Sequence, residues 1–453
     1  MKKEWTTKQA ILLCLGVSIL LFAWCNLLAP VAGMGGSDYF QIASGGFFLN
    51  SSNGCQTYFT AIPCENSYTG TMNWILRPLS ALFSGFDVRG LASIYFLAVL
   101  LSMAYFIAKY PAEKSWYKLL IAGVGIFLFC DFAYLLHLNS LNIEGAFYCV
   151  ILVTVCLILS QLYGKPGMIR TLLCALLSFF AAGLKPGYFW IGIFLALCLI
   201  PTLFVRKDLW YRIVTACLAV AVSVGSVVCF SGGVFFQKEQ QNRFHAIYYG
   251  ILKDNPDTAA VLDLGLPAEA EQYVGKTVYD VDSAVLDDGR LSVNYGKIIG
   301  YYLTHPSAFL EKLECAADNG YEIRQQYVSN YPEIQKLKYG FNLYSGLKRR
   351  FIQPDFWFVL AFFGAVIIWC GIRLKKAEQN VQKAQALFLI LLCVAALFAF
   401  MAPIFVSGEA ALGAELFLYN ILFDVVLCHV IVGGTMILLK RRENVQKKYG
   451  VQQ

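Results

Sequence analysis

About ten apolar runs, each close to the ~20 residues that a helix needs to cross a bilayer, divide this chain. Backbone polar groups in lipid must be paired within their own segment, so runs of this length favour helices. A closed β-barrel would show short segments of alternating hydrophobicity instead, and none dominates here. The hydrophobic fraction is 58% and the charged fraction 14%, far below the ~25% charged residues of an average soluble domain. We therefore expect an all-α polytopic membrane protein.

The expected spans lie where apolar residues continue for roughly membrane length. The run Thr171–Leu184 is shorter than the others, and the long polar segment Val234–Gln353 separates the seventh span from the eighth. In chain order the spans are Gln9–Ala29, Gly90–Ala108, Leu119–Leu138, Glu144–Leu162, Thr171–Leu184, Tyr188–Val205, Ile213–Val234, Asp355–Leu374, Ala384–Val406 and Ala414–Leu439.

Charge predicts the orientation of these spans. A cytoplasmic N-terminus places most of the 36 basic residues, and few of the 29 acidic residues, in cytoplasmic segments. Both termini are then cytoplasmic, Val234–Gln353 is extracytoplasmic, and the protein belongs in the plasma membrane. The net charge of +7 reflects this topology and does not indicate nucleic-acid binding. No cleavable signal peptide is evident, because the first run is long enough to span and lacks an obvious cleavage site.

Three regions follow from this layout. The polar segment contains two helix-like stretches, Pro267–Tyr273 and Pro306–Asn319, the second with proline in its first turn. The first outside loop ends in an amphipathic stretch, residues 71–85, suited to an interfacial helix. We expect an N-terminal transmembrane module (1–233) with outside loops 31–89, 137–144 and 185–187, a small, mostly helical extracytoplasmic domain (234–353), and C-terminal helices with a basic tail (354–453).

Two carboxylates stand at the outer ends of spans. Asp38, followed by Tyr39 in GMGGSDYFQ, can act as a general base for an acceptor hydroxyl. It can equally cap an interfacial helix that begins at Tyr39. Glu144 closes a tight loop that also contains His137 and Asn142, and these polar groups either face the same cavity as Asp38 or form a solvated turn.

Cations at the same membrane face are candidates for binding phosphate. Lys185, in LKPG, can pair with an anionic headgroup or a pyrophosphate, or it can snorkel at a helix end. Arg243 and His245 lie near the start of the polar segment, and arginine binds phosphate bidentately. The run Lys348–Arg350 is more typical of headgroup contact.

Other polar residues allow two interpretations each. Asp131 and Asp424, within apolar spans, either line a site or make hydrogen bonds between helices. Cys55 and Cys64 bracket a short outside loop, where they form a disulfide or remain free thiols. Neither cysteine belongs to a zinc-binding pattern.

Several motifs are absent from the sequence: the P-loop, GxGxxG before a helix, HExxH and GxSxG. The chain therefore lacks a nucleotide-hydrolysing or cytosolic catalytic domain, and no nucleic-acid partner is expected. We expect no cofactor and no dedicated metal site, although the sequence does not exclude a divalent metal.

The layout resembles the GT-C superfamily of membrane glycosyltransferases, which have an acidic motif soon after the first span, interfacial helices and an outside domain. It is similar, more narrowly, to the polytopic hexose transferases of Gram-positive surface-glycan biosynthesis. The matching stretches, which extend to about Tyr331, are GSDYF (Asp38), NSLNIEG (Glu144), LKPGYF (Lys185), RFHAIYYGILKDNPD, LGLPAEAEQYVGKTVYD and YGKIIGYYLTHPSAFLEKL. GSDYFQ has one acidic residue where many members have two, which favours a single base over a metal.

The resemblance implies inverting transfer of a sugar from a polyprenyl-phosphate donor to a cell-surface glycan or lipid-linked acceptor at the outer face of the bilayer. Asp38 would deprotonate the acceptor, Glu144 would orient it, and Lys185, with Arg243, would stabilise the leaving phosphate. Two other functions are open: a surface-polysaccharide polymerase or ligase, which would depend more on arginine and histidine, and a non-enzymatic flippase or transporter of lipid-linked glycan.

Overall fold

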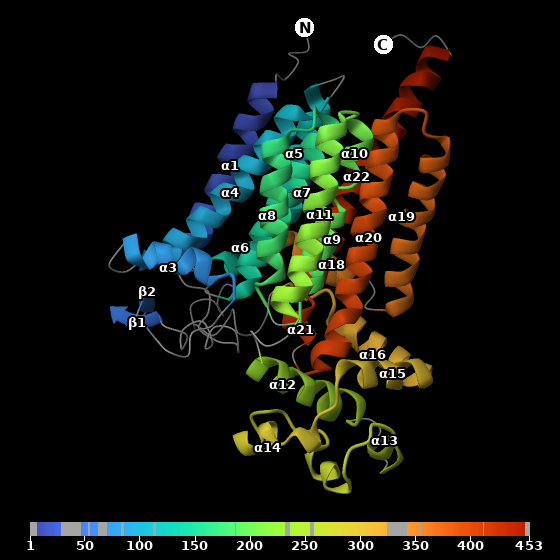
Figure 1. The fold of residues 1–453 in the computed structure, drawn as a ribbon. Helices are drawn as coiled ribbons and strands as arrows, with labels where there is room; N and C mark the ends of the chain where they lie inside the picture. The colour runs from blue at the N-terminus through green and yellow to red at the C-terminus, as the bar shows by residue number, and fades with distance from the viewer. Residues whose placement is uncertain are drawn as a thin grey trace.

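The computed structural model describes most of the chain. The described residues are 7–28, 47–52, 55–61, 70–82, 86–111, 115–140, 142–185, 187–231, 236–253, 258–323, 342–352, 355–410 and 412–448. Their architecture is a bundle of long helices with a smaller helical lobe beneath it (Figure 1).

All ten expected apolar runs contain helix, and the prediction of a helical polytopic membrane protein is confirmed. Among the described residues seven helices are long and apolar enough to cross a bilayer. They are α1 (Thr7–Leu28), α4 (Val88–Lys109), α7 (Ile143–Tyr163), α11 (Leu209–Phe230), α19 (Phe356–Lys376), α20 (Asn380–Ser407) and α22 (Phe417–Lys448). The shorter apolar helices are α8 (Met168–Ala182), α9 (Phe189–Leu197) and α10 (Thr202–Val205).

The expected span Leu119–Leu138 is not one straight helix. It forms α5 (Ser115–Phe129) and α6 (Phe132–Leu138), which meet at an angle of 67°. Asp131 explains the break, because its carboxylate accepts the Ala133 N–H and begins a new helix. With this bent pair counted as one, the spans number up to eight.

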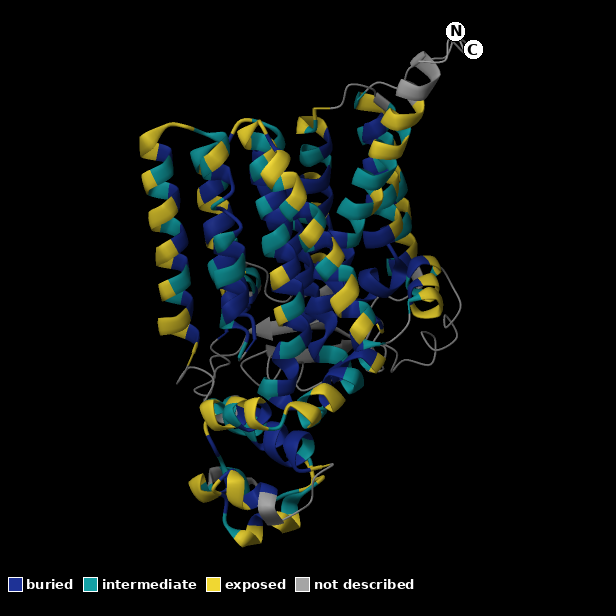
Figure 2. Ribbon diagram, turned by 90° about the vertical axis from the view of Figure 1, so that its right-hand side faces the viewer, coloured by how far each residue is buried: buried dark blue, intermediate teal, exposed yellow. Residues whose placement is uncertain are grey.

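Helix α7 lies at the centre of the bundle and its apolar window is entirely buried. Helices α4, α8, α20 and α22 pack around it. Figure 2 shows that the buried residues lie toward the interior of the bundle. Outward-facing side chains on the surrounding helices are apolar, including Leu20, Ile169 and Val228. An apolar helix with no polar face is stable only inside protein or lipid, so this exterior agrees with a membrane-embedded bundle.

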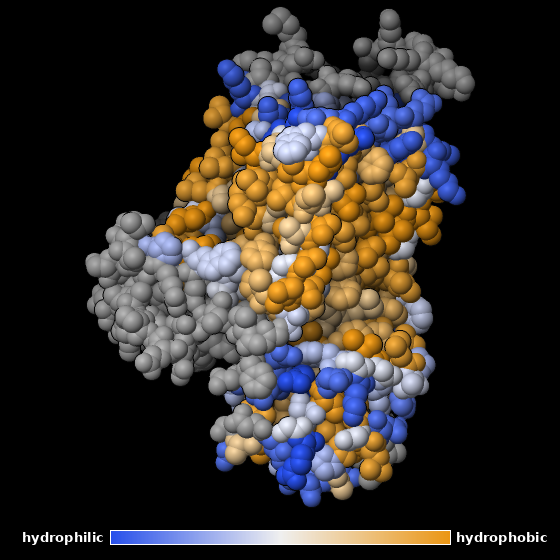
Figure 3. All heavy atoms as spheres, in the orientation of Figure 1, coloured by the Kyte–Doolittle hydropathy of each residue, from blue (hydrophilic) through white to orange (hydrophobic). Residues whose placement is uncertain are grey.

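Hydrophilic residues gather at the two ends of the bundle (Figure 3). At one end, where α1 begins, lie Arg373, Lys375, Lys376, Arg441 and Arg442; we call this the basic end. At the other, the polar end, lies the lobe built from residues 236–323 (Figure 1). A band of apolar side chains separates them (Figure 3).

The lobe at the polar end is mostly helical, as expected. The stretch Pro267–Tyr273 contains a 3₁₀ helix, and the helix expected over Pro306–Asn319 has those bounds. The elements are α12 (Phe236–Phe244), the π-helix η1 (His245–Ile251), α13 (Thr258–Asp263), η2 (Ala268–Tyr273), α14 (Ser283–Asp287), η3 (Gly289–Leu291), α15 (Tyr295–Thr304) and α16 (Pro306–Asn319).

A small sheet lies between α1 and α4, where the sequence indicated only interfacial helix. Strands β1 (Phe47–Ser52) and β2 (Cys55–Ala61) are antiparallel, and β3 (Phe86–Asp87) pairs with β2. The amphipathic helix expected over residues 71–85 is present as α3 (Asn73–Leu82). The β-branched and aromatic residues of QTYFTA suit a short strand, but this signal is weaker than that of the spans.

Helix α18 (Leu343–Phe351) departs from the expected 234–353 domain, because it packs against the bundle. The Lys348 ammonium lies 2.7 Å from the Asp424 carboxylate of α22 and 2.8 Å from the Asn420 amide oxygen. Lys348 is fully buried, so the headgroup contact expected for this residue is wrong, whereas Arg349 and Arg350 remain exposed. Desolvation explains the pairing, since a buried ammonium needs a counter-charge.

Gly408, between α20 and α22, should not tolerate alanine. Its φ is +60°, and a Cβ there would lie 2.8 Å from the Gly250 Cα in η1. We expect Gly408→Ala to lower stability by more than the ~1–3 kcal/mol of backbone strain alone. Gly275→Ala is the matched control, because its φ is +74° and nothing lies within 4 Å of its Cβ. Thermal unfolding in detergent micelles measures both; equal losses would show that the backbone contact is not tight.

Candidate functional site

The two described glycines between α8 and α9 are closely packed. Gly187 has a φ of +79°, and a Cβ there would lie 2.9 Å from Val406 Cγ1 on α20. The Gly183 carbonyl accepts the Thr71 N–H at 2.9 Å, and a Cβ on Gly183 would meet Thr71 at 2.5 Å. Lys185 therefore lies between two closely packed glycines at the polar end of the bundle.

Lys185 forms a buried ion pair. Its Nζ lies 3.0 Å from Glu415 Oε1, and the side chains are only 7% and 8% exposed. The Tyr188 hydroxyl donates to the other carboxylate oxygen, Oε2, and the ammonium lies 5.5 Å from the centre of the Tyr188 ring. Glu415 comes from α21 (Leu412–Glu415), so the pair joins the N-terminal and C-terminal parts of the bundle.

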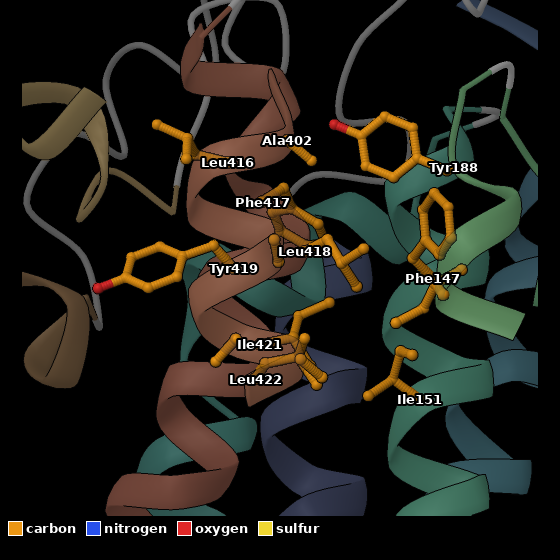
Figure 4. Packing of buried hydrophobic residues seen from close by; sticks show 14 of the residues in the cluster. Phe147, Ile151, Tyr188, Ala402, Leu416, Phe417, Leu418, Tyr419, Ile421 and Leu422 are labelled. Carbon is orange, nitrogen blue, oxygen red and sulfur yellow. The ribbon is translucent and has the colours of Figure 1, made fainter. Parts of the chain in front are cut away.

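The first turn of α7 adjoins this pair. The Phe147 ring lies 5.9 Å from the Tyr188 ring, and Figure 4 shows the two side by side. Glu144, one turn before Phe147, is 4% exposed. Asn142 occupies the N-cap position of the same helix and is 2% exposed, but its side chain makes no capping hydrogen bond. Its side-chain amide atoms have no hydrogen-bond partner in the part of the chain that the structure describes. The ring contact therefore places the first turn of α7, with its buried Glu144 and Asn142 side chains, next to Tyr188.

Two residues of the lobe, Arg243 and Tyr295, lie within electrostatic range of each other, and Tyr295 lies within range of Glu415. The Tyr295 phenol is buried and experiences the charges of Glu239, Arg243 and Glu415, and burial with the Glu239 charge raises the pKa of this phenol. The Arg243 Nε is also buried and has no hydrogen-bond partner within the described residues. An unsatisfied buried guanidinium nitrogen is costly unless a ligand pairs with it.

We call the group Glu144, Lys185, Tyr188, Arg243, Tyr295 and Glu415 the junction site, because it lies where the bundle meets the lobe. It contains two cations, two carboxylates and two phenols, largely removed from solvent. Such a site can bind an anionic group by charge and hold a hydroxyl by hydrogen bonding. Among the described residues, no cluster of three histidine, cysteine or acidic side chains could hold a metal ion.

Comparison with known families gives one match. The family described as the YfdI N-terminal transmembrane domain matches residues 1–451. The chain belongs to this family. No curated protein and no solved structure matches it. The YfdI-type match includes both Lys185 and Glu415, so the whole junction site lies within the family's domain.

His245, predicted to bind phosphate, lies inside the lobe. Its Nε2 accepts the Val278 N–H at 3.1 Å, at the start of the π-helix η1. This nitrogen is therefore an acceptor inside the lobe of the YfdI-type domain, rather than a donor to phosphate.

Two further predicted residues fix the broken span. Nε2 of His137 lies 2.8 Å from the Ile323 carbonyl oxygen, and its ring packs 4.3 Å from that of Phe417. The Asp131 carboxylate accepts hydrogen bonds from Ala133, from the backbone of Tyr344, and from the backbone and hydroxyl of Ser345. These contacts favour the structural interpretation of Asp131 over site lining.

Four residues predicted from the first outside loop are beyond structural description. Asp38, Tyr39 and Cys64 lie outside the described residues, and of Cys55 only the backbone, at the start of β2, is described. Their predicted roles therefore stay predictions.

The sequence did not single out Glu415 or Tyr295. Glu415 is one acidic residue in SGEAALGAE, at the start of the last span of the YfdI-type domain. One sequence feature could have indicated Glu415: it lies at the same expected membrane face as Lys185, which is a lone cation between two apolar runs. Tyr295 opens α15 and has no local feature that distinguishes it from the chain's other tyrosines.

Proposed function

We propose that this protein is a membrane glycosyltransferase of GT-C type that moves a sugar from a polyprenyl-phosphate donor to a surface-glycan or lipid-linked acceptor. The observation that carries the proposal is the junction site. Lys185 and Arg243 provide two cations at the polar end of a membrane bundle, and Arg243 has a buried Nε with no protein partner within the described residues. A lipid-linked phosphate presents its charge at that depth.

The proposed reaction inverts the anomeric carbon. Asp38 takes the proton of the acceptor hydroxyl, the hydroxyl oxygen bonds to the anomeric carbon, and the bond from that carbon to the phosphate oxygen breaks. The phosphate leaves with the electron pair, and Lys185 and Arg243 stabilise its charge. Glu144 orients the acceptor. The Tyr188–Glu415 contact holds Lys185 in place before the charge develops.

The proposed orientation places the lobe outside the cell and the basic end in the cytoplasm of a plasma-membrane protein. It is supported by the concentration of lysine and arginine at the basic end (Figure 3). Donor and acceptor would then meet at the outer face of the bilayer, with Asp38 in the first outside loop.

The proposal is tested on purified full chain in lipid nanodiscs. A panel of polyprenyl-phosphate sugars is supplied with a glycan acceptor, and release of free polyprenyl phosphate is followed by mass spectrometry. We expect release by the wild type and its loss in Asp38→Asn. Asp318→Asn is the matched control, because Asp318 is an exposed carboxylate on α16.

Two outcomes would contradict the proposal. Full activity of correctly folded Asp38→Asn would remove the assignment of the base. No turnover with any donor, together with binding of a lipid-linked oligosaccharide, would indicate a polymerase, ligase or transporter. Loss of polymer formation in Arg243→Ala, with Asp38→Ala unaffected, would select the polymerase or ligase.

A further inference from the structure

A cavity of about 130 Å³ lies within the bundle, away from the junction site. Helices α4, α5 and α7 line one side of it, and α19, α20 and α22 line the other. Its residues extend from the middle of these helices to the basic end, whereas the junction site lies at the polar end. The two sites therefore belong to opposite halves of the membrane-embedded part.

The depth of the cavity matches one leaflet of a bilayer. Its lining on α7 extends from Leu152 to Tyr163, and on α22 from Val425 to Met436. Each stripe rises by about 16 Å at ~1.5 Å per residue. Half of a ~30 Å hydrocarbon core has about the same thickness.

The side chains that line the cavity suit a hydrocarbon ligand. They are mostly aliphatic and aromatic. Tyr110, Arg373 and Gln385 lie toward the basic end, whereas His429 lies deeper, with its Nδ1 2.8 Å from the Val425 carbonyl oxygen of its own helix. An apolar cavity of ~150 Å³ stays dry and binds a small hydrocarbon. The cavity therefore has room for part of one chain, and its polar mouth lies where a lipid head group would be.

Arg373 gives the mouth its charge. This residue is exposed, its guanidinium lies 4.9 Å from the centre of the Trp369 ring, and it is within electrostatic range of the Tyr110 and Tyr163 phenols. No carboxylate among the described residues lies within ion-pair distance of it. Arginine binds phosphate oxygens bidentately, so an anionic head group suits this position.

We propose that this cavity binds one acyl chain of an anionic phospholipid whose head group contacts Arg373. The site is independent of the proposed glycosyl transfer, because its charged mouth is at the end opposite Lys185 and Glu415. A lipid held between the two groups of helices would support the packing of α22 against α5 and α7 from the basic end.

The test introduces a larger side chain that occupies part of the cavity. Gly433 lines it, and a Cβ there would make only an ordinary contact, 3.7 Å from Trp369. Gly433→Leu therefore adds volume inside the cavity without a backbone clash. Gly434→Leu is the matched control, since Gly434 does not line the cavity and nothing lies within 4 Å of its Cβ.

Purified full chain in detergent micelles is titrated with phosphatidylglycerol, and separately with phosphatidylcholine of the same acyl chains. Native mass spectrometry counts the bound lipid. We expect wild type and Gly434→Leu to bind one phosphatidylglycerol, and Gly433→Leu to bind it at least about tenfold more weakly. Arg373→Gln should bind both lipids alike, losing a preference of about fivefold for the anionic one.

Three results would overturn the proposal. The first is equal lipid binding by Gly433→Leu and Gly434→Leu. The second is a wild type that does not distinguish the two head groups. The third is displacement of phosphatidylglycerol from the wild type by an equimolar amount of polyprenyl phosphate, which would assign the cavity to the tail of the sugar donor.

Discussion

Lys185→Met should reduce the release of polyprenyl phosphate by about 10²–10³-fold, the usual effect of removing one preorganised group that stabilises developing charge. The loss should appear in kcat, because the charge on the leaving phosphate increases toward the transition state. Turnover in nanodiscs, measured across donor concentrations, separates kcat from KM. Lys185→Arg should keep part of the activity, since it preserves the charge but changes the geometry of donation.

The control for this prediction separates loss of activity from loss of the buried Lys185–Glu415 ion pair. Lys185→Met alone leaves Glu415 as a buried carboxylate without this cation, which lowers stability. The double variant Lys185→Met/Glu415→Gln removes both charges, and the glutamine oxygen can still accept the Tyr188 hydroxyl. We expect the double variant to recover thermal stability but not activity.

The double variant separates a functional Lys185 from a structural one. If Lys185 serves only to join the segment between α8 and α9 to α21, the recovery of stability would bring activity back with it. A fully active double variant would therefore remove Lys185 from the proposed mechanism, whereas an inactive variant that unfolds at the wild-type temperature supports it.

Asp424→Asn should lower the free energy of unfolding by about 3–5 kcal/mol, the usual cost of leaving a buried charge without its partner. The Lys348 and Asp424 side chains are both 0% exposed, and Asp424 also accepts the hydroxyls of Tyr134 and Tyr344. Unfolding in detergent micelles, followed by tryptophan fluorescence, measures the change. Arg349→Met is the matched control, since this neighbouring side chain is 76% exposed and should change stability little.

A double variant tests whether the charge itself causes the loss. Lys348→Met/Asp424→Asn removes both charges and keeps an amide oxygen as acceptor for the two tyrosines. We expect it to be more stable than either single variant, because neither charge then remains buried alone. Losses that simply add would show that the two side chains stabilise α18 independently of each other.

Local properties of the sequence determined the helical part of this protein. Hydropathy located every apolar helix, and proline in the first turn with glycine after the last residue located α16 at Pro306–Asn319. These features depend on residues only a few positions apart, so they can be recognised directly in the sequence. The bend at Asp131 was less visible, because apolar residues continue on both sides of it and only the cap interrupts the helix.

The sequence also marked Glu144, Lys185 and Arg243 as candidates, since charged groups next to apolar runs are uncommon. Only the tertiary structure decided their partners. Tyr188 and Glu415 are 227 positions apart, and Lys348 and Asp424 are 76 positions apart. Helix packing brings these groups together, and burial then makes pairing necessary because an isolated charge out of water is too costly. Neither the packing nor the burial can be read from local spacing.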